Sequence, residues 1–229
     1  MRTIPLATAL LLALAITLPC RALDWQAFED PQSVLLTDAF AESIGKLPAD
    51  EKTTAIARLQ DSLESKEVEI RRRAALTLGT LGDKRGVPTM IEDLATAQGS
   101  DRDNVVVALR ILKDKRAIGA LRKALEDKSP YVRGIAVAAL GELKAVEAYD
   151  QIVAMTSDKG EKPGGKADGK LDCLQISPAQ MACYALGALG DQRAVPVLTR
   201  LRDDRELKTF ADQALGMLAT QKIDGVPPK

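Results

Sequence analysis

A pair of leucines recurs along most of the chain at a fixed interval, and this repeat limits the possible folds more than any other feature. Leu81, Leu112 and Leu143 are 31 residues apart, and Leu189 follows after one interval plus an insertion of about 15 residues. Another leucine stands three positions before each of them, and an alanine or valine four positions before that. Residues three and four positions apart share one face of a helix. The repeat therefore predicts a series of similar amphipathic helices.

Each predicted helix is followed by a turn and by a second apolar stretch. Gly82, Gly190, Lys113 and Lys144 stand where the first helix of a unit should end, a position that often takes a left-handed residue. Such a unit is an αα-hairpin, which cannot bury its apolar face alone and must stack on its neighbours. We therefore expect an all-α fold, a right-handed α-solenoid of about five helical hairpins.

The predicted turns carry a recurring acid–base pair. An aspartate is followed two positions later by an arginine, as in Asp114 and Arg116, except in the third unit, where Ala145 and Glu147 replace them. The aspartate is expected to cap the second helix. The arginine is expected to pair with the aspartate of its own or the adjacent repeat, and the alternative is a ladder of arginines that binds an anionic ligand. The other two pairs are Asp83 with Arg85 and Asp191 with Arg193.

Two segments resemble a known repeat family. Pro130-Tyr131-Val132-Arg133, with residues 136–141, and the run A-L-G-x-L-G-D at 185–191 are similar to HEAT repeats in their short, phycocyanobilin-lyase-like form. The resemblance covers residues 67–221 and implies HEAT-like hairpins that serve as a scaffold. We expect an N-terminal helical cap at 23–66, a repeat array at 67–221 that contains an inserted flexible loop at 157–177, and a disordered tail at 222–229.

The first 22 residues have the pattern of a signal peptide. Arg2 precedes an apolar run from Leu6 to Leu18, which is too short to span a bilayer as a helix. Small residues then predict cleavage after Ala22, so that the mature chain begins at Leu23. The alternatives are an uncleaved anchor or a lipid on Cys20. We expect a periplasmic or secreted protein with no stable membrane insertion after cleavage.

Export changes the interpretation of the cysteines. Only Cys173 and Cys183 follow the signal peptide, and an even pair in an oxidising compartment predicts a disulfide. The alternative is two independent thiols, with Cys183 a small core residue.

The composition narrows the functional classes. The chain has no histidine, and its 32 Lys and Arg balance 32 Asp and Glu. It therefore lacks the commonest general base and zinc ligand, and it has no bulk positive charge for nucleic acid. Lyases that attach bilin chromophores share this short repeat but act on cytoplasmic antenna proteins, so export argues against that activity. We expect no enzyme activity, cofactor, metal or nucleic acid, with a lyase-like enzyme as a remote alternative.

The expected function is binding of another protein of unknown identity. The second helices of the units, at about 84–97, 115–127, 145–157 and 192–203, are expected to line one broad surface of mixed charge, which suits a protein partner. The alternative is a structural subunit of an envelope complex. The loop at 157–177 is either a solvated linker or part of the partner contact. The candidate partner surface comprises Arg85, Arg116, Arg122, Lys123, Arg193 and Arg200.

Overall fold

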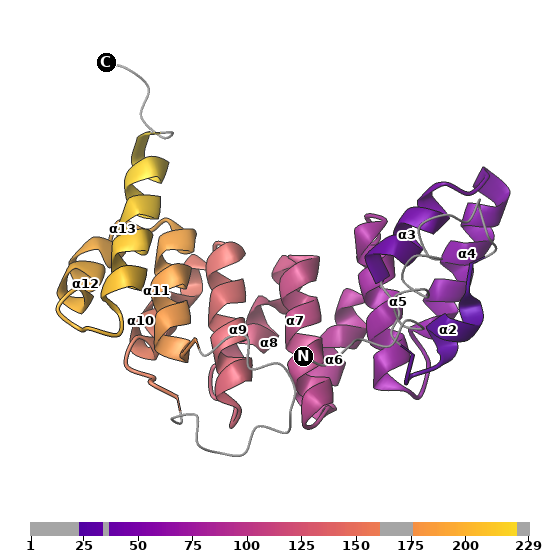
Figure 1. Ribbon diagram of the computed structural model, residues 1–229, viewed down its shortest axis with the longest axis horizontal. Coiled ribbons are helices and arrows are strands. Elements are labelled where there is room, and N and C mark those ends of the chain that lie inside the picture. Colours follow the sequence, from indigo (N-terminus) through magenta and orange to yellow (C-terminus); the bar gives the residue numbers. More distant parts are fainter. Residues whose placement is uncertain (1–22, 34–36, 161–175, 224–229) are drawn as a thin grey trace, which may run out of the picture.

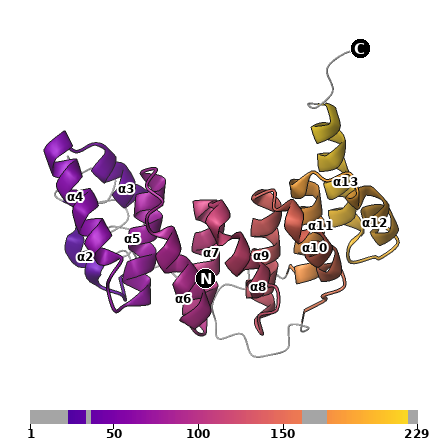
Figure 2. The same cartoon turned by 180° about the vertical axis from the view of Figure 1, so that it is seen from behind.

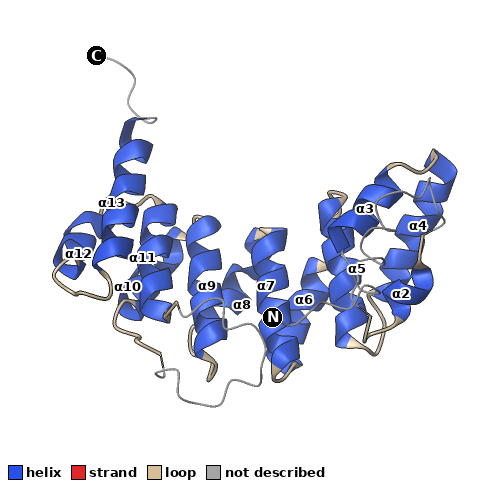
Figure 3. Ribbon diagram, in the orientation of Figure 1, coloured by secondary structure: helices blue, strands red, loops and turns tan. Residues whose placement is uncertain are grey.

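A computed structural model describes residues 23–33, 37–160 and 176–223, and throughout these ranges the regular structure is helical, with no strand (Figure 3). This confirms the all-α solenoid. Twelve α-helices are formed in the described residues. They are α2 (Trp25–Glu29), α3 (Thr37–Gly45), α4 (Ala49–Ser62), α5 (Val68–Thr80), α6 (Val87–Thr96), α7 (Ser100–Leu112), α8 (Ile118–Ala124), α9 (Pro130–Glu142), α10 (Tyr149–Met155), α11 (Pro178–Leu189), α12 (Ala194–Leu201) and α13 (Lys208–Ile223).

The hairpins stack into an arched array of two layers. The first helices α5, α7, α9, α11 and α13 each pack on the next, and the second helices α6, α8, α10 and α12 form the other layer (Figures 1 and 2). The second helices are shorter than expected because 3₁₀ turns precede α8, at Lys115–Ala117, and α10, at Val146–Ala148. The expected second-helix surface is therefore broken into short helices.

The turns between the two helices of a unit have the predicted geometry. Gly82 and Gly190 adopt φ angles of 84° and 83°, and Lys113 and Lys144 adopt 46° and 56°, so all four are left-handed. The predicted cap is confirmed in the second unit, where the Asp114 carboxylate accepts a hydrogen bond of 2.9 Å from the Arg116 amide at the start of the 3₁₀ turn. Asp83 and Asp191 make the same bond within their turns, but α6 and α12 begin later, after Gly86 and Arg193, and have no side-chain cap. A tight reversal thus follows each of these first helices.

Glycines allow the first helices to approach one another closely. A β-carbon added to Gly187 would lie 2.8 Å from the α-carbon of Ala214, and one added to Gly141 would lie 2.5 Å from the α-carbon of Ala185. Both distances are shorter than packed carbon atoms tolerate. The close contacts of α9 with α11 and of α11 with α13 therefore require a residue without a side chain at positions 141 and 187.

In three hairpins a largely buried ion pair joins the first helix to the end of the second. An arginine near the start of the first helix pairs with an aspartate near the end of the second, at 2.8 Å for Arg102 and Asp127 and 2.6 Å for Arg133 and Asp158. Buried charges require such partners. The arginines recur every 31 residues, and sequence reasoning singled out Arg133 only as part of a motif. The third pair joins Arg71 to Asp93.

One buried arginine attaches the N-terminal segment to the array. Arg73 on α5 is only 2% exposed. Its guanidinium donates hydrogen bonds to the carbonyl oxygens of Phe28 at 3.1 Å, Asp30 at 2.8 Å and Ser33 at 2.6 Å. Together with α3 and α4, which also pack near α5, this segment covers the N-terminal end of the repeats.

The last helix differs from the other first helices at one repeat position. Val106, Val137 and Cys183 are fully buried there, whereas α13 carries Asp212, which is exposed and lies 2.6 Å from Arg202. A charged residue at this position gives α13 a polar outer face, as terminal repeats require for solubility. Across the described ranges, no helix has the length and apolar character needed to cross a membrane.

Candidate protein-binding site

The three turn arginines of the predicted surface are tied into the turns. Arg85 and Arg193 each lie 2.6 Å from the aspartate two positions earlier, and Arg116 lies 3.0 Å from Asp114. This confirms the predicted pairing within a repeat. The hydrogen bond from Arg116 lowers the pKa of Asp114 from 3.8 to about 2.

Two of these arginines also reach the preceding repeat. Arg116 donates a hydrogen bond of 2.9 Å to the carbonyl oxygen of Lys84. The guanidinium of Arg193 lies over the ring of Tyr149, 4.2 Å from its centre, in a cation–π contact. The arginines therefore link successive turns, while more than half of each side chain remains exposed, from 53% to 62%.

The other three predicted residues lie on the second helices. Arg122 is half-buried on α8 and donates a hydrogen bond of 2.5 Å to the side-chain oxygen of Gln151 on α10. Lys123 on α8 and Arg200 on α12 are exposed. The structure thus divides the six candidates into a row of turns and separate helical positions rather than one cluster.

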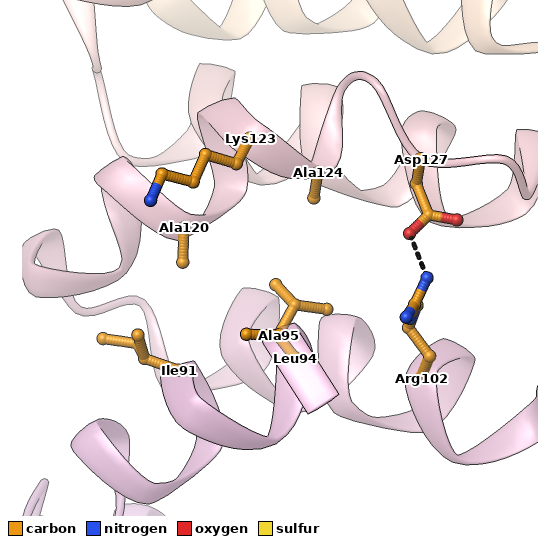
Figure 4. A pocket seen from close by; sticks show the side chains of 8 residues that line it. All are labelled: Ile91, Leu94, Ala95, Arg102, Ala120, Lys123, Ala124 and Asp127. Atoms are coloured by element: carbon orange, nitrogen blue, oxygen red, sulfur yellow. Dashed lines mark hydrogen bonds and ion pairs between the residues drawn. The ribbon is translucent and has the colours of Figure 1, made fainter. Parts of the chain in front are cut away.

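Lys123 borders an apolar groove between α6 and α8 (Figure 4). The groove has a volume of about 340 Å³. Lys123 lies at one end of it, and the Arg102–Asp127 ion pair lies at the other. Its apolar lining consists of Ile91, Leu94, Ala95, Ala120 and Ala124.

Helical spacing and small side chains create this groove. Ile91 and Ala95 are one turn apart on α6, and Ala120 and Ala124 are one turn apart on α8, so each pair shares a face. Three of these four side chains are methyl groups, which leave space between the two helices. Sequence reasoning missed these residues because it followed the charged positions, although the four-residue spacing was visible. Among the described residues that line it, the groove combines an apolar floor with the exposed Lys123 ammonium group.

Only one cysteine of the predicted disulfide, Cys183, lies among the described residues. Cys183 on α11 is fully buried, and burial raises the pKa of its thiol to about 11. Cys173 lies outside the described residues, as do Ala22 at the predicted cleavage site and residues 161–175 of the predicted loop. Among the described residues, no group of three or more acidic, cysteine or histidine side chains is placed to bind a metal ion.

The fold and the groove define a repeat protein whose helical hairpins form a solenoid with an open surface. Comparison with known families gives the class: residues 97–162 match HEAT repeats, and residues 70–92 and 181–204 match the PBS lyase HEAT-like repeat. These matches show that the chain contains HEAT repeats and PBS lyase HEAT-like repeats. This confirms the resemblance inferred from the sequence.

A curated relative comes from bilin metabolism. The chain is 27% identical over 157 residues to the bilin biosynthesis protein PecE of Mastigocladus laminosus. The match covers 61% of this chain and 58% of PecE, so the chain spans less than two thirds of that relative.

Two solved structures share the solenoid. The complex of CpcE and CpcF of phycocyanin lyase from Nostoc sp. PCC7120 matches with a TM-score of 0.55 and 21% identity, over 84% of this chain and 68% of that one. The X-ray structure of the Escherichia coli protein YibA matches with a TM-score of 0.56 and 17% identity, over 84% of this chain and 66% of that one. At these identities the likeness shows the fold alone.

The prediction that the chain is not an enzyme is wrong. It rested on the missing histidine and on the signal peptide, but the matches to a bilin biosynthesis protein and to a phycocyanin lyase connect the fold and sequence with enzymatic proteins. The absence of histidine excludes one common catalytic group rather than catalysis as such.

Proposed function

We propose that the chain is an adaptor that binds another protein through the face formed by its second helices, with the groove between α6 and α8 as the main contact. The observation that carries this proposal is the groove itself, an apolar recess between α6 and α8 with Lys123 at one end and the Arg102–Asp127 ion pair at the other (Figure 4). Apolar recesses bordered by polar groups are typical anchoring points of protein interfaces.

The chemistry of the groove defines its partner. The apolar floor suits the apolar face of an amphipathic helix, which binds such grooves through side chains one turn apart. Lys123 is exposed at one end, whereas Arg102 is neutralised by Asp127 at the other. The partner helix should therefore carry an acidic residue near Lys123 and no charge elsewhere along the contact.

Affinity purification of groove variants tests this proposal. Ala120→Glu places a carboxylate on the apolar floor, and Lys208→Glu makes a charge change on exposed α13 as a control. The partner should be retained by the wild type and by Lys208→Glu and lost with Ala120→Glu. Equal retention by all three would contradict the groove. A stoichiometric, salt-resistant partner would favour the second role, a structural subunit of a complex.

The relationship to PecE favours a second candidate function. PecE is a bilin biosynthesis protein, and the complex of CpcE and CpcF belongs to a phycocyanin lyase. This chain would then take part in handling a bilin or in its attachment to a protein. The match covers only 58% of PecE at 27% identity, so the substrate and the reaction remain part of the proposal.

Absorption spectroscopy tests the second candidate. Binding to a protein restricts the conformation of an open-chain tetrapyrrole, so its visible absorption should sharpen and shift when the purified chain is added. Serum albumin at the same concentration controls for nonspecific uptake. An unchanged spectrum, or the same change with albumin, would count against a bilin-related role.

Export is proposed on the sequence pattern of residues 1–22 alone. The purified exported protein should begin with Leu23-Asp24-Trp25 when its N-terminus is sequenced. An intact N-terminus would contradict cleavage after Ala22.

A further inference from the structure

One first helix lacks the glycine that the others carry. Gly79, Gly141 and Gly187 occupy the same repeat position, two residues before the recurring leucine, and each faces the following first helix. On α7 this position is Arg110. A bulky side chain stands there, and α7 contacts α9 less extensively than α9 contacts α11.

Arg110 belongs to a hydrogen-bonded network across three first helices. Its Nε and Nη2 atoms donate to the Oε1 atom of Glu142 on α9, at 3.0 Å and 2.6 Å. The hydroxyl of Tyr184 on α11 donates to the same oxygen at 3.0 Å. Burial and the Glu142 carboxylate both raise the pKa of Tyr184, so the phenol stays neutral. The network therefore has no net charge.

A hollow of about 290 Å³ opens beside this network, on the opposite layer from the groove of Figure 4. Its lining is apolar and aromatic apart from Arg110 and Gln213. The hydrogen bonds from Arg110 to Glu142 use its Nε and Nη2 atoms and leave Nη1 out, while the guanidinium also interacts with the Tyr184 side chain. The remaining lining residues are Pro130, Tyr131, Gly134, Ile135, Ile176, Met181, Tyr184 and Phe210.

We propose that this hollow binds a small, uncharged aromatic compound of one or two rings that carries a carbonyl or hydroxyl group. Aromatic rings and a methionine sulfur favour a flat aromatic ligand. The Arg110 Nη1 atom supplies a donor for an oxygen acceptor. Because Glu142 neutralises Arg110, an anionic ligand would lose its hydration without gaining a net opposite charge. The volume lies near the lower end of small-molecule sites, which limits the ligand to one or two rings.

The site is independent of the proposed function because it shares no lining residue with the groove between α6 and α8. The site also includes Arg110, which stands at the repeat position where the other first helices have glycine. Arg110 replaces a packing glycine and gains a partner on the next helix, which a purely structural repeat does not need.

Fluorescence anisotropy of 2-naphthol, titrated with the full chain, tests the site. Gly134→Leu fills the hollow, and Gly119→Leu makes the same change at an exposed position on α8 with open space around it. We expect saturable binding to the wild type and to Gly119→Leu and at least a tenfold weaker affinity for Gly134→Leu. The anionic 2-naphthoate should bind the wild type several-fold more weakly than 2-naphthol does.

Gly134→Ala is a smaller substitution at the same position, and it provides a test of the site even if Gly134→Leu does not fold. A β-carbon at residue 134 would lie 3.7 Å from Met181 and 3.8 Å from Pro178, which are ordinary contacts. This variant should fold and bind 2-naphthol with a smaller loss. The inference is overturned if 2-naphthol shows no saturable binding, if both Gly134 variants bind like the wild type, or if 2-naphthoate binds more tightly.

Discussion

Gly141 on α9 lies against Ala185 on α11 so closely that an added β-carbon would be 2.5 Å from both the α-carbon and the carbonyl oxygen of Ala185. The obstacle is backbone, which cannot rotate away as a side-chain end can. Gly134 lies on the same helix, two turns earlier, and has only ordinary contacts at 3.7 Å and beyond. The two glycines of α9 therefore differ in what they do for the stack.

Gly141→Ala should destabilise the protein. The added methyl group has to push α9 and α11 apart, and overpacking of this kind costs about 1–3 kcal/mol. Gly134→Ala should leave stability unchanged or raise it by up to about 1 kcal/mol, since alanine is the better helix former. Urea unfolding followed by circular dichroism measures both, and equal midpoints for the two variants would contradict the close contact.

Asp114→Asn should reduce stability in a pH-dependent way. Because the folded pKa of about 2 is below the ordinary 3.8, the ionised carboxylate stabilises the fold above the unfolded pKa. This contribution is lost as the pH falls from about 4 to 2. Asparagine can still cap the turn, and the pair is solvent-exposed on the arginine side, so the loss at pH 7 should be about 1 kcal/mol or less.

The comparison of unfolding free energies at pH 7 and pH 2 checks this expectation. The difference between the wild type and Asp114→Asn should be largest at pH 7 and should nearly vanish at pH 2. Asp203→Asn, an exposed residue on the segment after α12, serves as a control and should show little difference. If the difference in unfolding free energy between the wild type and Asp114→Asn grew toward low pH, the expected direction of the pH dependence would be contradicted.

Arg73→Met should release the N-terminal segment from α5. Methionine keeps much of the length but none of the hydrogen bonds to Phe28, Asp30 and Ser33. Amide hydrogen exchange of residues 25–30 should therefore accelerate, while exchange in α9 stays unchanged. Arg72→Met is the matched control, because Arg72 pairs with Glu69 and not with the segment. Equal exchange in both variants would count against the attachment.

The proposed Cys173–Cys183 bridge can be tested by thiol counting after unfolding without reductant. Cys183 is buried, and burial raises the pKa of its reduced thiol to about 11, so slow alkylation of the folded protein would not distinguish a disulfide from a buried thiol. In guanidinium chloride, protein from its native compartment should show no alkylated cysteine and a linked peptide in the mass spectrum. Two alkylated cysteines would leave Cys183 as a core residue only.

Periodicity was enough to predict the solenoid, because the 31-residue interval records which residues face the core. The left-handed Lys113 and the pairing of Asp114 with Arg116 also followed from local spacing. Contacts between segments that are distant in the sequence could not be predicted from local spacing. The attachment of the N-terminal segment by Arg73 joins residues 40 to 45 positions apart, and nothing in the local sequence indicates its partners.

The candidate site was predicted only in part. Lys123 was identified because it is charged, while the groove beside it is made of residues such as Ala95 and Ala120 that resemble ordinary helix formers. Whether an alanine lines a groove or a packed interface depends on how far the neighbouring helix lies, which periodicity does not specify. The enzymatic relatives were set aside because compartment arguments were given more weight than the shared repeat.

Site-specific photo-crosslinking shows whether a partner protein binds over the groove between α6 and α8. A benzophenone side chain at exposed Ala95 would lie in the groove, and one at exposed Asn104 on α7 would lie on the first-helix layer. We expect one discrete adduct with the partner from position 95 and none from position 104. An adduct from position 104 alone would contradict binding over the groove.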